Sequence, residues 1–465
     1  MTAATIVWLR DDLRLDDHPA LTAATERGAP LVVVFVLDDE STEVRPIGAA
    51  SRWWLHHSLT SLDAALRERG GRLVLRRGPA ETVIRELVAE VGADTVHWTR
   101  RYGAAREIDA RLKAHLRASG VTATSFPGTV LHEPWTIETG QGGPYRVFTP
   151  FWRACLQRPI HAPLPEPDFT STRWATPASD SLESWALLPT RPDWAAGLRA
   201  TWTPGEAGAT ERLDAFLAEG LTLYHRRDEP AIDSTSTLSP HLRFGEVSPN
   251  RIWARLMTDD LSPAALANCA KFQSELGWRE FCRHLLFFNT ELATQNHKRE
   301  FDVMPWRDDP ASVDAWQRGQ TGIPLVDAGM RELWVTGTMH NRVRMVTASL
   351  LVKHLLTDWR VGEQWFWDTL VDADEASNPA NWQWVAGSGA DASPYIRVFN
   401  PQLQSEKFDR DGVYVRRWVP ELGTPAYPAP IVDLAEGRRD ALAAFERMRA
   451  QPSQSTTTTT DSTES

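Results

Sequence analysis

Five short apolar runs, separated by stretches of helical periodicity, constrain the fold of the first 126 residues. The runs are nearly continuous in hydrophobicity, as buried parallel strands are. They lie at residues 5–9, 31–38, 72–77, 95–100 and 121–126. Between the second and third runs, apolar residues from Trp54 to Leu66 recur at helical spacing until Gly70 ends the pattern. This alternation predicts a doubly wound α/β domain with a parallel sheet, spanning residues 1–135.

The character of the chain changes twice beyond this domain. Residues 155–205 are rich in proline, serine and threonine, so we expect a connecting segment over 136–205 that wraps across the surface. From residue 206 the periodicity is helical, which predicts a large all-α domain over 206–450. Residues 451–465 are a low-complexity tail that we expect to be disordered.

Composition restricts the environment of the protein. No apolar run approaches the roughly 20 residues of a membrane span, and charged residues follow Met1 too closely for a secretory signal. The three cysteines are widely spaced and form no disulfide or metal-ligand pattern, which favours a reducing cytoplasm. We therefore expect a cytoplasmic monomer without a membrane association or an obligate protein partner.

Charge and motifs narrow the function classes. A formal net charge of -11 disfavours an indiscriminate polyanion binder, although a local basic face remains open. The first turn of the predicted sheet lacks the glycines of a dinucleotide-binding fingerprint, and "GSGADA" at 387–392 follows no predicted strand. No P-loop, HExxH or nucleophile-elbow motif occurs. The chemistry is therefore expected in the helical half.

One predicted helix there carries mixed chemistry on a single face. Phe272, Glu275, Trp278, Arg279 and Cys282 follow one another at three- and four-residue steps. Glu275 and Arg279 either form a structural salt bridge or line a pocket. In "MHNRVRMVTASLLVK", the next candidate helix, a polar residue and a thioether head an apolar stripe, which is typical of a cavity rim.

Two further segments complete the candidate site. "STSTLSPHLRFGE" at 234–246 collects hydroxyls and backbone donors, which suits a diphosphate but also a helix cap. Asp372 and Asp374 lie in a polar turn, where a metal site is a weak interpretation and a carboxylate partner for Arg344 a better one. We predict no metal site.

These segments together resemble one family. "WLRDDLRLDDHPAL", "STSTLSPHLRFGE", "ELGWREFCRHL" and "LVDADEASNPANWQW" are similar to motifs of the photolyase/cryptochrome flavoproteins, nearest to the bacterial class I cyclobutane pyrimidine dimer photolyases. The resemblance covers residues 4 to about 450. It implies an α/β antenna domain followed by a helical domain that holds FAD in a U-shaped conformation.

The resemblance also implies an activity. Members of this kind are carbon–carbon lyases that repair UV-damaged DNA: photoexcited reduced FAD passes an electron to a flipped-out pyrimidine dimer, and the cyclobutane ring splits. The alternative within the family is a cryptochrome-type blue-light receptor without repair activity.

The resemblance assigns residues to the FAD site. Arg344 and Asp372 are expected to flank the flavin, Asp374 to lie at the edge of its ring, and Asn378 to face N5. The phosphate shell and the other cofactor contacts are expected from Tyr224, Thr235, Ser236, Thr237, Leu238, Ser239, Phe272, Glu275, Arg279 and Asn341.

It also assigns residues to the lesion and to electron transfer. Trp278 and Trp384 are expected to form two walls of the dimer pocket, with Glu275, Asn341 and Met345 against the damaged bases. Trp382, Trp359 and Trp306 are expected to carry electrons inward from the surface. Arg227, Arg342 and Arg397 are expected to contact DNA phosphates, which reconciles DNA binding with the acidic total.

The chain departs from the family pattern at several positions. Phe272 stands where many relatives carry tryptophan, and Thr237 where arginine is common. Ala105 and Arg106 replace the Asn-Glu pair expected for a folate antenna. We therefore favour 8-hydroxy-5-deazaflavin over methenyltetrahydrofolate as a second chromophore, with an empty antenna site as the alternative.

Overall fold

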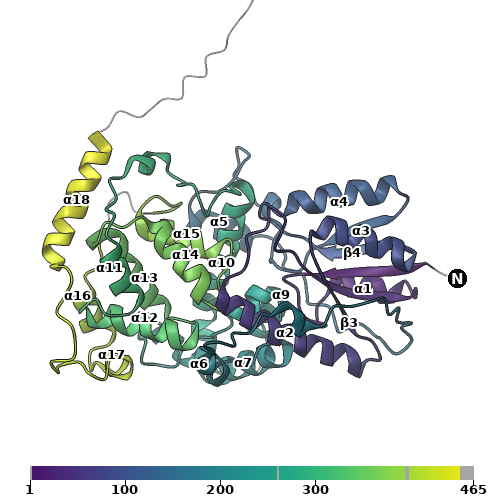
Figure 1. Ribbon diagram of the computed structural model, residues 1–465, viewed down its shortest axis with the longest axis horizontal. Helices are drawn as coiled ribbons and strands as arrows, with labels where there is room; N and C mark the ends of the chain where they lie inside the picture. Colours follow the sequence, from purple (N-terminus) through teal and green to yellow (C-terminus); the bar gives the residue numbers. More distant parts are fainter. Residues whose placement is uncertain (1–2, 259–260, 393–396, 451–465) are drawn as a thin grey trace, which may run out of the picture.

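The computed structural model describes residues 3–258, 261–392 and 397–450. A five-stranded sheet domain lies at one end of the molecule and a larger body of helices at the other, with the helix α18 (Leu434–Ala450) furthest from the sheet (Figure 1). The tail expected to be disordered, 451–465, lies outside the described residues. No helix among the described residues is long and apolar enough to cross a membrane.

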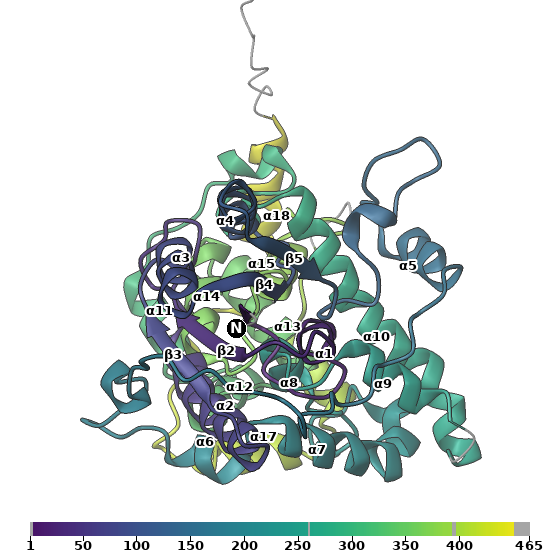
Figure 2. The same ribbon diagram turned by 90° about the vertical axis from the view of Figure 1, so that its right-hand side faces the viewer.

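The sheet confirms the predicted α/β fold. All pairings are parallel, in the order β3-β2-β1-β4-β5. The strands are β1 (Ala4–Leu9), β2 (Leu31–Leu37), β3 (Leu73–Arg77), β4 (Ala93–Thr99) and β5 (Thr122–Phe126). β1 and β2 are buried along their whole length, because helices cover both faces of the sheet. Figure 2 views this domain from its own side, with the helical body behind it.

Alternate residues of each strand enter two separate cores. Val7 and Leu9 point toward α1 (Pro19–Glu26) and α2 (Ala49–Glu68), whereas Ile6 and Trp8 pack with α3 (Ala80–Val91) and α4 (Arg106–Ala118). This is the two-residue period of a strand between two helical layers.

The segment over 136–205 is more than a surface connection, and the expectation that it only wraps the exterior is wrong. η1 (Pro134–Thr136) leads into it, and it contains α5 (Phe148–Leu156), η2 (Leu182–Trp185) and α6 (Ala196–Thr201). Phe169, Trp185, Leu187 and Leu198 are buried in the same core as α1 and α2. Its apolar residues are too sparse to show a period, and they divide between the domains, because Phe148, Phe151 and Trp152 of α5 pack against α10 (Pro263–Phe288) instead.

The remainder is helical, as predicted. Its elements are α7 (Glu206–Ala218), η3 (Gly220–Arg226), α8 (Ser239–Phe244), α9 (Pro249–Leu256), α10 (Pro263–Phe288), η4 (Arg299–Val303), α11 (Pro310–Gln317), α12 (Pro324–Thr336), α13 (Asn341–Ser349), the π-helical turn η5 (Leu350–His354), α14 (Trp359–Thr369), α15 (Ser377–Ala386), α16 (Pro401–Phe408), α17 (Val413–Trp418) and α18 (Leu434–Ala450). The π-turn interrupts the apolar stripe of "MHNRVRMVTASLLVK" after Ser349.

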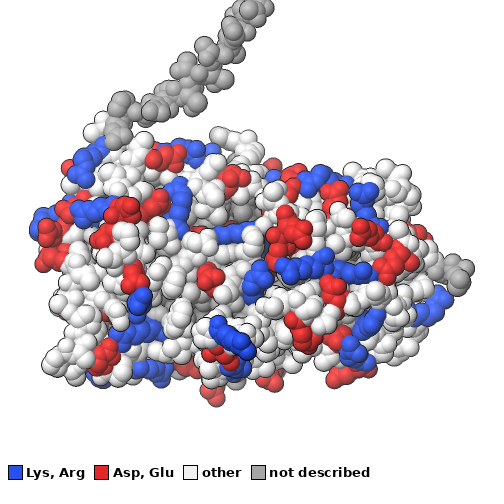
Figure 3. All heavy atoms as spheres, in the orientation of Figure 1, with Lys and Arg blue, Asp and Glu red and all other residues white. Residues whose placement is uncertain are grey.

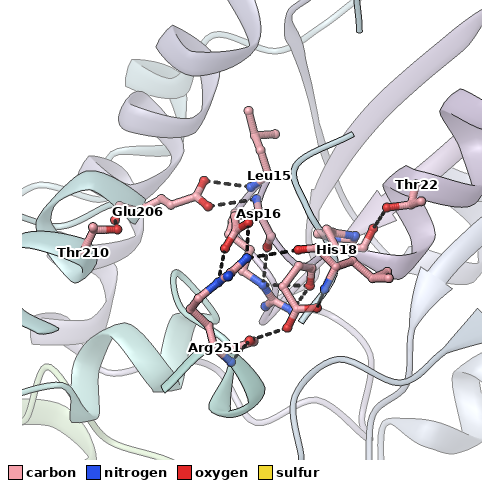
Figure 4. Close-up of polar contacts among 11 residues, drawn as sticks. Leu15, Asp16, His18, Thr22, Glu206, Thr210 and Arg251 are labelled. Carbon is pink, nitrogen blue, oxygen red and sulfur yellow. Dashed lines mark hydrogen bonds and ion pairs between the residues drawn. The ribbon is translucent and has the colours of Figure 1, made fainter. Parts of the chain in front are cut away.

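Polar contacts tie the two domains together. Arg251 of α9 makes two bonds to the carboxylate of Asp16, at 2.7 and 2.6 Å, and Glu206 of α7 accepts from the backbone N–H groups of Leu15 and Asp16 (Figure 4). These contacts show that the segment after β1 joins the sheet to the helical domain.

The surface carries charges of both signs. On the face seen in Figure 3, basic and acidic side chains are interspersed.

Candidate cofactor and substrate site

An ion pair connects α13 to the turn before α15. Arg344 donates to both carboxylate oxygens of Asp372, at 3.1 and 3.0 Å. Ser239, the first residue of α8, donates its hydroxyl to Asp372 at 2.6 Å. Arg344 also holds the carbonyl of Met339 at 2.7 Å. The predicted partnership of Arg344 and Asp372 is therefore present, and it brings the hydroxyl-rich segment beside it.

The hydroxyl-rich segment has the features of an anion cradle. Ser234 is fully buried, and its Oγ has no hydrogen-bond partner among the described residues. Thr237 adopts a left-handed backbone with φ of 51°, and Leu238 precedes the first turn of α8. Thr235 and Ser236 are partly buried. An unpartnered buried hydroxyl beside backbone donors fits a diphosphate better than a cap alone.

Sequence reasoning missed Arg212 on α7. Its guanidinium donates to Thr237 Oγ1 at 3.0 Å and to the carbonyl of Thr201 at 2.6 Å. Burial lowers its pKa, so the environment disfavours this cation unless an anion joins it. Arg212 is 25 residues from Thr237 in sequence, so no local pattern connects them. The only indication in the sequence was that Thr237 stands where relatives commonly carry arginine, which left the cation of this site to come from another segment.

Asp374 is held by an arginine and by backbone N–H groups of the protein itself. Its carboxylate pairs with Arg283 of α10 at 2.5 Å and accepts from the N–H groups of Ala376 and Ser377, at 2.9 and 2.7 Å. Although burial opposes ionisation, the charges of Arg283 and Arg243 lower the pKa of Asp374 to about 2. Asp374 therefore fixes the start of α15, and its predicted place at the flavin edge stays a prediction.

Asn378, on the first turn of α15, is buried and oriented by Glu363. Its Nδ2 donates to the main-chain oxygen of Glu363 at 3.0 Å and to the Glu363 carboxylate at 2.9 Å. Glu363 belongs to α14 and is itself buried. Sequence reasoning missed Glu363, because only the approach of α14 to α15 makes it a neighbour.

The mixed face of α10 divides into a polar and an aromatic part. Glu275 pairs with Arg227 at 3.3 Å and with Lys271 at 3.1 Å, and Arg279 pairs with Glu280 at 3.2 Å. The structure thus contains no Glu275–Arg279 salt bridge. Phe272 lies in a buried cluster with Tyr224, edge to face at 5.3 Å, and Trp278 stacks on Phe148 at 3.8 Å.

A chain of contacts leads from α10 to α13. Arg227 also approaches Asp228 at 3.6 Å, and Asp228 pairs with Arg342 at 2.9 Å. Arg342 NH1 lies 3.9 Å from the sulfur of Met345, one turn along α13. Asn341 is the exposed first residue of that helix. Glu275, Arg227, Arg342 and Met345 therefore form one continuous patch, in which Asp228 links the two arginines.

The predicted electron-transfer tryptophans share a hydrophobic core. Trp359 and Trp382 are buried in it and Trp306 packs against it. The rim of Trp382 lies on α14 at Gly362, where an added Cβ would be only 2.1 Å from the ring. Trp384, two residues on, is partly buried, with exposed Arg397 above its ring at 5.5 Å. Trp382 and Trp384, two residues apart on α15, thus lie in different surroundings.

A separate pocket lies between the domains. It is lined by Arg10, Asp11, Thr99, Arg100, Arg101, Tyr102, Thr129, Arg283 and Glu375. The residues after β1 and after β4 meet there, at the point where the strand order of the sheet reverses. Open α/β sheets bind ligands at this position. Most of its basic side chains come from the ends of these two strands.

Comparison with known proteins identifies the family. The model described as DNA photolyase matches residues 5–168, and the one described as the FAD binding domain of DNA photolyase matches residues 272–426. A deoxyribodipyrimidine photo-lyase of Agrobacterium fabrum is 51% identical, covering 96% of this chain and 98% of the relative. This protein belongs to the photolyase/cryptochrome family.

Other members of the family show its range. The crystal structure of a class III photolyase from Agrobacterium tumefaciens is 50% identical, with a TM-score of 0.92 over 97% of this chain and 98% of that one. Cryptochrome-2 of Arabidopsis thaliana is 36% identical over 91% of this chain and 71% of its own length. These likenesses confirm the predicted two-part architecture of an α/β domain and a helical FAD-binding domain. They do not confirm the expected nearness to class I.

Proposed function

We propose that the protein repairs cyclobutane pyrimidine dimers in DNA with blue light. The observation that carries this is the patch of Glu275, Arg227, Arg342 and Met345, because it joins α10 and α13 beside the stacked Trp278. A flipped pyrimidine dimer needs an apolar surface to stack on, hydrogen-bonding groups for its carbonyls and cations for the flanking phosphates. The patch contains all three kinds of group.

The cofactor chemistry rests on the residues that fit FAD. The segment 234–239, with Arg212 beside it, would hold the diphosphate, and Arg344, Asp372 and Asn378 would flank the isoalloxazine. Reduced FAD supplies the photoexcited electron when it is bound. The protein's part is to orient the lesion, to exclude water and to place Glu275 as a hydrogen-bonding acid at the pyrimidine carbonyls.

Trp382, Trp359 and Trp306 form the proposed route by which bound flavin is reduced. They share one continuous hydrophobic core, which supports this role. Trp384 and Trp278 are proposed as walls of the dimer pocket, with Asn341 and Met345 against the bases. Arg397 joins the phosphate contacts because it lies exposed over Trp384.

The pocket between the domains is proposed to hold the second chromophore. Its arginines suit a chromophore with an anionic tail, and its position at the switch between β1 and β4 is that of a ligand site in an open sheet. We keep 8-hydroxy-5-deazaflavin as the favoured chromophore, because Ala105 and Arg106 stand where a folate antenna would need Asn and Glu. We propose a cytoplasmic monomer that acts on damaged DNA.

The deciding experiment measures repair of a defined oligonucleotide that carries either a cyclobutane thymine dimer or a (6-4) product. Reduced protein is illuminated with blue light, and a dark sample is the control. Repair of the cyclobutane dimer alone supports the proposal. Absence of repair with FAD bound and photoreducible would instead favour a photoreceptor.

A further inference from the structure

The orientation of the Asn378 side chain follows from its neighbours. Its amide nitrogen faces the main-chain oxygen and the carboxylate of Glu363, at 3.0 and 2.9 Å. Both are acceptors only, so the amide NH₂ must point to them and Oδ1 must point away. No described residue donates a hydrogen bond to Oδ1. Asn378 therefore offers an acceptor to whatever lies on its other side.

Glu363 is in turn fixed by a residue of the other domain. Arg45, between β2 and α2, makes two bonds to the Glu363 carboxylate, at 2.7 and 2.8 Å. Its guanidinium also donates to Gln364 at 2.8 Å and lies 4.0 Å above the ring of Trp367. A planar fork matched to a carboxylate fixes both oxygens, which a point charge does not. Arg45 is thus clamped onto α14 and holds Glu363 in one orientation.

We infer that Arg45 is a positioning residue that acts on the cofactor site from the α/β domain. Through Glu363 it keeps the carbonyl of Asn378 facing the flavin as an acceptor. The inference rests on the proposed function, in which Asn378 faces N5. A hydrogen-bond acceptor that faces a nitrogen stabilises the form of that nitrogen that carries a proton. Reduced flavin carries a proton on N5 that oxidised flavin lacks, so Arg45 raises the midpoint potential of the bound flavin.

A purely structural role for Arg45 makes a different prediction, and the chain provides a matched control. Arg251 also makes two bonds to one carboxylate, that of Asp16, and also joins the two domains (Figure 4). The arginine side chains are similarly exposed, 28% for Arg45 and 31% for Arg251. Arg251 makes no contact with Glu363 or Asn378 among the interactions of the described residues. Loss of domain adhesion alone would affect both variants alike.

The test compares the full FAD-loaded chain with Arg45→Ala, Arg45→Lys and Arg251→Ala. The midpoint potential of the flavin and the rate of its light-driven reduction are measured, with the melting temperature and the Kd for FAD as folding checks. Arg45→Ala should lower the potential and slow reduction by about tenfold, the scale on which outer partners of a functional group act. Arg251→Ala should leave both at the wild-type value. Arg45→Lys, which keeps the charge and the fold but not the fork, should lie between.

The outcomes separate the two hypotheses. An unchanged potential in Arg45→Ala and Arg45→Lys with FAD bound, or an equal shift in Arg251→Ala, would overturn the inference and leave the proposed function standing. A wild-type chain that binds no FAD would overturn the proposed function itself. If Arg45→Ala does not fold, the lysine variant decides, because a potential equal to wild type then contradicts the role of the fork.

Discussion

Arg344 and Asp372 form a two-point ion pair that closes one side of the candidate cofactor site, and the side chain of Asp372 is only 5% exposed. Arg344→Ala would leave this carboxylate with Ser239 as its one remaining side-chain donor among the described residues. Removing one partner of such a pair costs about 3 kcal/mol. We expect a fall of that size in the free energy of unfolding, measured with urea, and a higher Kd for FAD.

The exposed pair of Asp314, on α11, and Arg318, which directly follows that helix, is the control for this variant. Arg318→Ala should change the free energy of unfolding, measured with urea, by less than about 0.5 kcal/mol, because solvated pairs contribute little. Equal effects of the two substitutions would contradict a special role for Arg344.

Glu275 should govern repair and not cofactor retention. Its side chain is partly exposed and is held by Arg227 and Lys271, not by the core. Glu275→Gln replaces the carboxyl group, which would donate a proton to a pyrimidine carbonyl as negative charge arrives there, with an amide that cannot, and such general acids contribute on the order of 10² in rate. The quantum yield of dimer repair should fall while FAD content stays at the wild-type level. Glu229→Gln, which alters a nearby acid paired with Arg226, should repair normally. Equal yields in both variants would remove Glu275 from the mechanism.

The strands, and the site residues that lie within a recognisable local motif, could be predicted from the sequence. Near-continuous apolar runs predict buried parallel strands, and those of β1 and β2 are confirmed. The pairing of Arg344 with Asp372 could be predicted because an arginine at a cavity rim needs a carboxylate partner. Glu363, Arg45 and Arg212 could not be predicted, since each acts through a tertiary contact with a residue distant in the chain. The core role of Phe169 and Trp185 was hidden because isolated aromatics in a proline-rich segment show no period.

Trp306 should control the entry of electrons and not repair. It packs at the margin of the core that buries Trp359 and Trp382. Phenylalanine preserves most of the packing but is far harder to oxidise, so Trp306→Phe should block light-driven reduction of oxidised flavin. Enzyme reduced chemically beforehand should repair dimers as well as wild type. Trp194→Phe, at the margin of the sheet-domain core, is the control and should photoreduce normally. Intact photoreduction in Trp306→Phe would contradict the proposed route.

Asp374 should make stability fall in strong acid. The pKa of its carboxyl is about 2 in the folded chain, against about 3.9 when unfolded. A depressed folded pKa gives stability that is fully present above pH 4 and is lost as the pH falls through 2, by roughly 2 to 3 kcal/mol. Asp374→Asn should therefore be less stable at pH 7 and lose less between pH 4 and pH 2. Asp314→Asn, at an exposed pair with Arg318, is the control, and its free energy of unfolding in urea should depend on pH as that of the wild type does. If the free energy of unfolding depends on pH in the same way in the wild type and in Asp374→Asn, the ionised pair with Arg283 does not stabilise α15.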